Sequence, residues 1–124
     1  MVTTPTKLIS VGVLFLCTLL SGFRVSSSGK PYSVFILTIH KLISLSALIY
    51  LVVTVVRANR SAPLSPTMWL VSGLTGLLFA GTIATGGMLS TESQMPPIVK
   101  TLHHVTPYLT TVGAGIGLYL LGGA

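Results

Sequence analysis

Four long apolar segments separated by short polar connections constrain the fold of this chain more than any other feature. They cover residues 7–23, 32–57, 67–89 and 97–121 of the 124 residues. About 17–25 apolar residues in a helix cross the hydrocarbon core of a bilayer. Because backbone polar groups in lipid must be satisfied internally, each segment is predicted to be an α-helix. We predict an all-α, integral membrane four-helix up-and-down bundle, with residues 1–124 forming a single transmembrane domain.

The charge content also indicates a membrane protein. Only 6% of the residues are charged, 51% are hydrophobic, and the mean hydropathy is +0.90. A soluble domain has about a quarter charged residues, so this chain cannot cover a water-facing surface. The net charge of +6 comes from basic residues beside the apolar segments, where they meet lipid headgroups. We therefore expect the lipid bilayer as a partner and no nucleic-acid binding.

The six basic residues that flank the apolar segments are divided equally between the two predicted membrane faces, so they do not decide the orientation. One face has Lys7, Arg57 and Arg60, and the other has Arg24, Lys30 and Lys100. If the second group serves an anionic cofactor, both termini are cytoplasmic, and we expect a prokaryotic inner (plasma) membrane. A cleaved signal peptide is the alternative interpretation of the first segment, but Arg24 lies where a cleavage region is usually uncharged.

All three histidines lie inside apolar segments: His40 in the second, and His103 and His104 in the fourth. An ionisable side chain at membrane depth is costly and is by default a functional candidate. The second and fourth segments run parallel in an up-and-down bundle. His40 lies about 13 Å beyond Pro31, and His103 about 9 Å beyond Pro97, at 1.5 Å per residue. We therefore predict that His40 faces one histidine of the fourth segment.

A haem iron between two imidazoles is the favoured occupant of this histidine layer. Adjacent residues differ by about 100° around a helix, so at most one of His103 and His104 faces His40. His104 is preferred by a small margin because Tyr108 lies on its face, although His103 shares its face with glycines. Small residues would leave room for a macrocycle, and nearby cations would meet its propionates. The predicted site residues are His40, His103, His104, Lys41, Arg24, Ser44, Gly86, Gly87 and Tyr108.

Two other interpretations of the histidines remain open: a structural or proton-handling pair, and a site for quinone or another ligand. A zinc site is not expected, because the usual third and fourth ligands are missing. The chain has no paired carboxylates, nucleotide-binding loop or nucleophile–base arrangement that would indicate a complete enzyme. We also expect no internal repeat.

Three short patches resemble the histidine-bearing helices of small b-type membrane cytochromes, loosely the cytochrome b561-like class. They are residues 37–42 (Leu-Thr-Ile-His-Lys-Leu), 84–87 (Ala-Thr-Gly-Gly) and 102–109 (Leu-His-His-Val-Thr-Pro-Tyr-Leu). The resemblance implies haem b held by histidines, here His40 with His103 or His104, and electron exchange with quinone, ascorbate or a partner protein. That family uses two haems and four histidines, whereas this chain can hold one haem near one face.

We accordingly predict a membrane electron-transfer protein with one bis-histidine b-type haem between the second and fourth helices. It would be an electron carrier or a subunit of an oxidoreductase, with a redox partner subunit or quinone, in a homo- or hetero-oligomer. The alternative is a non-redox or quinone-binding membrane-anchor subunit of a larger complex, in which the histidines form hydrogen bonds or handle protons.

Overall fold

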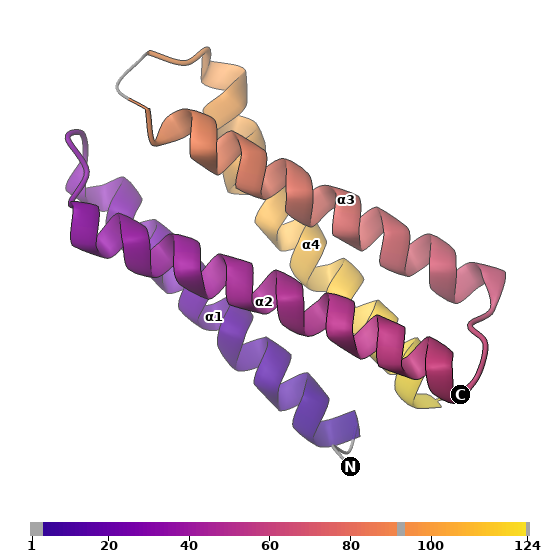
Figure 1. Ribbon diagram of the computed structural model, residues 1–124. Helices are drawn as coiled ribbons and strands as arrows, with labels where there is room; N and C mark the ends of the chain where they lie inside the picture. The colour runs from indigo at the N-terminus through magenta and orange to yellow at the C-terminus, as the bar shows by residue number, and fades with distance from the viewer. Residues whose placement is uncertain (1–3, 92–93, 124) are drawn as a thin grey trace.

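The computed structural model describes residues 4–91 and 94–123, and it contains four α-helices within those ranges (Figure 1). The helices are α1 (Thr4–Ser28), α2 (Val34–Ser61), α3 (Pro66–Leu89) and α4 (Pro97–Gly123). No strand occurs among these residues, and the predicted all-α fold is confirmed. The largest difference from the predicted bounds is at the end of α1, which continues five residues beyond Phe23 to Ser28. Gly29, with a φ of 67°, then ends that helix.

Three of the helices are long and apolar enough to cross a membrane: α1 from Pro5 to Ser28, and all of α2 and α3. These three helices indicate an integral membrane protein. α4 is equally long, with 27 residues, but it is more polar because it contains Lys100, two histidines and several threonines. Within the described residues, length and composition together therefore support the first three predicted spans.

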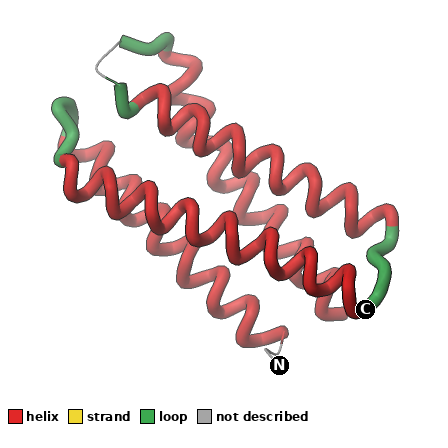
Figure 2. The backbone as a smooth tube through the Cα atoms, in the orientation of Figure 1, coloured by secondary structure: helices red, strands yellow, loops and turns green. Residues whose placement is uncertain are grey.

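The helices form two hairpins that lean against each other. α1 packs mainly on α2, and α3 packs mainly on α4, whereas contacts between the hairpins are less extensive. The α1–α2 and α3–α4 connections lie at one end of the molecule (Figure 2). Both chain ends and the α2–α3 connection lie at the other end. This is the up-and-down order in which α2 and α4 run parallel.

The residues at the helix starts explain where α2 and α3 begin. The Ser33 hydroxyl accepts a hydrogen bond from the Ile36 amide, and the Ser65 hydroxyl accepts one from the Met68 amide. A serine at the N-cap satisfies a backbone donor that the helix itself cannot. Pro66 follows at the first helical position of α3, where its missing N–H is not needed.

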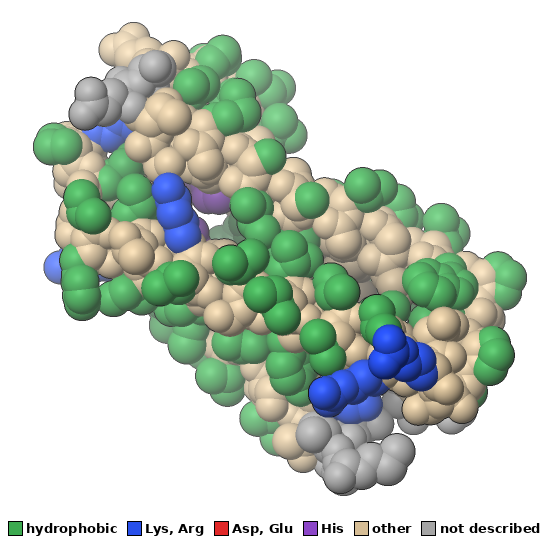
Figure 3. Space-filling model, viewed as in Figure 1, with side chains coloured by type: hydrophobic (Ala, Val, Ile, Leu, Met, Phe, Trp, Pro, Cys, Tyr) green, Lys and Arg blue, Asp and Glu red, His purple; other side chains and the backbone are tan. Residues whose placement is uncertain are grey.

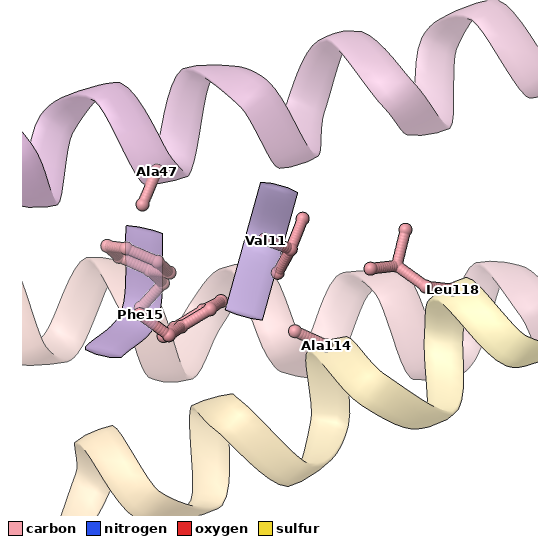
Figure 4. Packing of buried hydrophobic residues seen from close by; sticks show 6 residues of the cluster. Val11, Phe15, Ala47, Ala114 and Leu118 are labelled. Carbon is pink, nitrogen blue, oxygen red and sulfur yellow. The ribbon is translucent and has the colours of Figure 1, made fainter. Parts of the chain in front are cut away.

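A small apolar core lies between the two hairpins. Phe15 of α1 meets Phe79 of α3, with ring centroids 5.7 Å apart and planes tilted by 55°. Val11, Ala47, Ala114 and Leu118 are also buried and join the same cluster (Figure 4). Most other large apolar side chains are exposed, as suits a surface that faces lipid rather than water.

Candidate functional site

Two histidines from different hairpins face each other near the end that carries the α1–α2 and α3–α4 connections. The ring centroids of His40 (α2) and His103 (α4) are 6.5 Å apart, and the ring planes are nearly perpendicular, at 85°. Both side chains are half-buried. Our preference for His104 as the residue opposite His40 is not met: His104 is exposed and lies edge-on to His103, with centroids 6.3 Å apart.

His40 is held against α1. Its Nδ1 lies 2.9 Å from the Ser21 hydroxyl oxygen, and that hydroxyl donates its proton to the Thr18 carbonyl at 3.0 Å. While it donates to Thr18, the Ser21 hydroxyl can accept from Nδ1–H of His40. The ring also lies on Gly22, where an added Cβ would come within 2.9 Å of Cε1.

His103 is held against α3 in the same way. Its Nδ1 donates to the Thr82 carbonyl at 2.9 Å and lies 3.2 Å from the Thr85 hydroxyl oxygen. Because a carbonyl can only accept, Nδ1 carries the proton and Nε2 keeps its lone pair. A Cβ added at Gly86 would come within 2.7 Å of Cε1 of this ring.

The two half-sites come from an internal repeat, so our expectation of no repeat was wrong. Residues 12–22 and 76–86 share the pattern Gly-x-Leu-Phe-x-x-Thr-x-x-Ser/Thr-Gly, 64 residues apart. Phe15 and Phe79 occupy the same position of this pattern and meet between the hairpins. His40 and His103 lie outside the pattern, at a separation of 63 residues, and also meet between the hairpins. The sequence reasoning therefore missed the residues of α1 and α3 that hold the rings. They are Thr18, Ser21, Gly22, Thr82 and Thr85, and this repeat was the signal that could have identified them.

Of the other predicted residues, Gly86 lies directly against a ring of the facing pair, because a Cβ added there would come within 2.7 Å of Cε1 of His103. Gly87 has open space where a side chain would be, and the Ser44 hydroxyl donates to the His40 carbonyl within α2. Tyr108 is 65% exposed. Arg24 is also exposed.

Lys41 reaches from α2 to the other hairpin. Its Nζ donates to the Ser90 hydroxyl at 3.1 Å, and the Lys30 Nζ donates to the Thr91 carbonyl at 3.2 Å. In the space-filling view, the surface between the hairpins is hollowed at this end (Figure 3). Histidine side chains lie inside the opening, and a basic side chain lies in front of them. The structure thus places cations at the mouth of the histidine layer.

Two apolar grooves lie elsewhere between the hairpins. The larger by volume, about 300 Å³, is lined by α1 and α4 and includes Leu8 and Gly115. The other, about 230 Å³, is lined by α2, α3 and α4 and includes Val52 and Trp69. No histidine lines either groove, so the polar chemistry of this protein is concentrated at the other site.

The histidine pair could hold a metal only if other ligands came with it. Within residues 4–91 and 94–123, no group of three or more histidine, cysteine, aspartate or glutamate side chains could bind a metal ion. Two imidazoles fill two coordination positions, whereas a structural zinc site takes four protein ligands. The histidine pair alone would therefore leave at least two positions of such a site unfilled.

Comparisons with protein-family models, with curated proteins and with solved structures find no match for this chain. Its function must be inferred from the geometry of the site.

Proposed function

We propose that this protein is a membrane electron carrier, or an electron-carrying subunit of an oxidoreductase, that holds one b-type haem between His40 and His103. The pairing of the two rings carries the proposal. Two metal–nitrogen bonds of about 2 Å each, extended by two ring radii, would put the ring centres of a bis-imidazole complex about 6 Å apart. The centroids of His40 and His103 are 6.5 Å apart.

The hydrogen bonds of the two rings support this role. Nδ1 of His103 donates to a backbone carbonyl, and Nδ1 of His40 is hydrogen-bonded with the Ser21 hydroxyl. Metal-binding histidines usually donate their second ring N–H to such partners, which orients the ring and raises the basicity of the other nitrogen. Nε2 of each ring is consequently the nitrogen available to iron.

A haem also explains why two protein ligands suffice. Its macrocycle supplies four nitrogens, so the protein adds only the two axial ligands, whose identity, burial and hydrogen bonds set the potential of a one-electron couple. The proposed ligands come from different hairpins, so a bound haem would join the halves of the bundle. In this arrangement the chain's own residues hold, orient and desolvate the imidazoles.

The absorbance spectrum of the purified full-length protein, produced with ample haem, tests the proposal. We expect a low-spin b-type spectrum that sharpens on reduction with dithionite, with about one haem per chain because the site has one histidine pair. His40→Ala and His103→Ala should each abolish it. His104→Ala is the matched control, because it removes an adjacent but exposed imidazole, and it should keep the spectrum.

Two results would refute the proposal. One is a wild-type protein that stays colourless after incubation with haemin. The other is an unchanged low-spin spectrum in either His40→Ala or His103→Ala. A folded but colourless wild type would favour the histidines as a structural or proton-handling pair.

A further inference from the structure

We propose that Lys41 and Lys30 form a carboxylate-binding site at the mouth of the opening, and that this site binds the propionates of the haem. The inference rests on the proposed haem and adds the orientation in which it is held. The propionate edge of the haem would then lie at the end of the bundle that carries the α1–α2 and α3–α4 connections.

The positions of the two lysines carry the inference. Lys41 follows the proposed ligand His40 in α2, yet its Nζ bonds Ser90 beyond the end of α3. Lys30 reaches the neighbouring Thr91 carbonyl from the α1–α2 connection. Both side chains therefore bridge the two hairpins at the end that carries the histidine layer, and a basic side chain lies in front of the histidines (Figure 3).

The hydrogen-bond partners of these ammonium groups are neutral. Lys41 donates to a hydroxyl and Lys30 to a backbone carbonyl, and both groups are exposed. A carboxylate carries a full negative charge, so it adds a Coulomb attraction to the ammonium that a hydroxyl or a carbonyl cannot supply. A carboxylate that reaches the opening would thus displace these partners.

Charge balance at this end also favours an anionic ligand. Four basic residues belong to it: Arg24, Lys30, Lys41 and Lys100. The residues that the structure describes include no aspartate or glutamate, and the only acid of the whole chain is Glu92. Even full neutralisation by Glu92 would leave three positive charges here. A haem brings two carboxylates, which matches the two bridging lysines.

Porphyrins that differ only in their carboxylates test the site. Full-length apoprotein is titrated with ferric protoporphyrin IX and with its dimethyl ester, and binding is followed by absorbance. Lys41→Gln should weaken binding of the free acid about tenfold, and Lys30→Gln should weaken it less, because a hydrogen bond to a charged group is lost. Both variants should bind the ester as the wild type does, and Lys41→Arg should bind the free acid nearly normally.

Lys100→Gln is the matched control. It removes the same charge from the same end, but no bond from Lys100 to the other hairpin is present among the described residues. It should leave binding of the ester unchanged and should weaken binding of the free acid far less than Lys41→Gln does. An equal loss for acid and ester in Lys41→Gln would overturn the inference, because it would mean that Lys41 only joins the hairpins through Ser90. An unchanged affinity for the free acid in Lys41→Gln would also overturn it.

A lipid phosphate is the other anion that these lysines could bind. Thermal unfolding of the apoprotein in phosphatidylglycerol and phosphatidylcholine nanodiscs distinguishes binding of a lipid phosphate from binding of a haem propionate. A stabilisation by phosphatidylglycerol that Lys41→Gln removes, together with unchanged haem affinity, would assign the site to lipid and overturn the inference. If the wild type binds neither porphyrin through His40 and His103, the proposed function fails as well. If it binds both but Lys41→Gln has no effect, only the carboxylate site fails.

Discussion

In the first hairpin, His40 lies against Gly22 and 2.9 Å from the hydroxyl of Ser21, whereas in the second, His103 lies against Gly86 with the hydroxyl of Thr85 at 3.2 Å. The same short pattern thus places an imidazole at the same level of both hairpins. The candidate site is thus built from two half-sites, and each half-site is completed within one hairpin.

The hairpins differ in how closely their helices pack. The second has an additional hydrogen bond between its helices, from the Thr82 hydroxyl to the Thr106 hydroxyl at 2.7 Å. Ile43 occupies the position equivalent to Thr106, so this bond cannot form in the first hairpin. α3 and α4 also pack more extensively than α1 and α2. The second hairpin is therefore expected to hold its histidine more rigidly, and the first to respond more to the loss of a hydrogen bond to its ring.

The largest effects on stability should come from the phenylalanine pair that joins the hairpins. Phe15→Ala and Phe79→Ala should each reduce the free energy of unfolding by about 3 kcal/mol, since each leaves a cavity in the core. Chemical unfolding in detergent measures this effect, and Phe23→Ala, which alters a side chain that is 74% exposed, is the control. Because the two rings touch, the double variant should lose less than the sum of the single losses. Strictly additive losses would mean that the pair does not couple the hairpins.

Substitution of the two glycines that the imidazole rings contact should have the next largest effect on stability. Gly86→Ala and Gly22→Ala place a methyl group 2.7 Å and 2.9 Å from the facing Cε1 atoms, so each imidazole must shift. Overpacking of this kind costs about 1–3 kcal/mol, and we expect the larger loss at Gly86. Unfolding and haem retention should be measured together. Gly76→Ala is the control, because no atom lies within 4 Å of its new Cβ. Equal behaviour of all three variants would contradict the ring contacts.

Substitution of the hydroxyls that lie beside Nδ1 of the two rings should have a smaller effect, and the effect should differ between the two hairpins. Ser21→Ala should weaken haem binding by about 1 kcal/mol, the net contribution of a typical hydrogen bond. Thr85→Val should weaken it less, because His103 keeps its 2.9 Å bond to the Thr82 carbonyl. Haem titrations of the two variants, with the reduction potential as a second reading, measure the difference. A larger loss of haem affinity in Thr85→Val than in Ser21→Ala would mean that the second hairpin, and not the first, depends more on its hydroxyl.

Ser44→Ala should have the smallest effect of these substitutions. The Ser44 hydroxyl bonds the His40 carbonyl within its own helix and does not contact the ring in the described structure. We expect a change below about 0.5 kcal/mol in unfolding, as for substitutions away from special features. A loss of haem from this variant would show that the space beside His40 has been assigned incorrectly.

The sequence alone determined the helical architecture of the protein. Four apolar segments joined by short connections permit only α-helices in up-and-down order, because a bilayer offers the backbone no other hydrogen-bond partners. That order makes α2 and α4 parallel, and the distances of His40 and His103 from their helix starts then place them at a similar level. These inferences need only helix rise and chain direction, so local sequence was sufficient.

Only the tertiary structure decided which residues surround the histidines. One residue step rotates a side chain by about 100°, so the choice between His103 and His104 depends on how α4 is turned about its axis. Close packing sets that rotation: Gly113 of α4 lies on Thr75 of α3, where an added Cβ would come within 2.5 Å of the hydroxyl oxygen. Ser21 and Thr85 likewise meet the imidazoles through contacts between neighbouring helices. The repeat that contains these residues is present in the sequence, but its role becomes visible only when each hairpin closes.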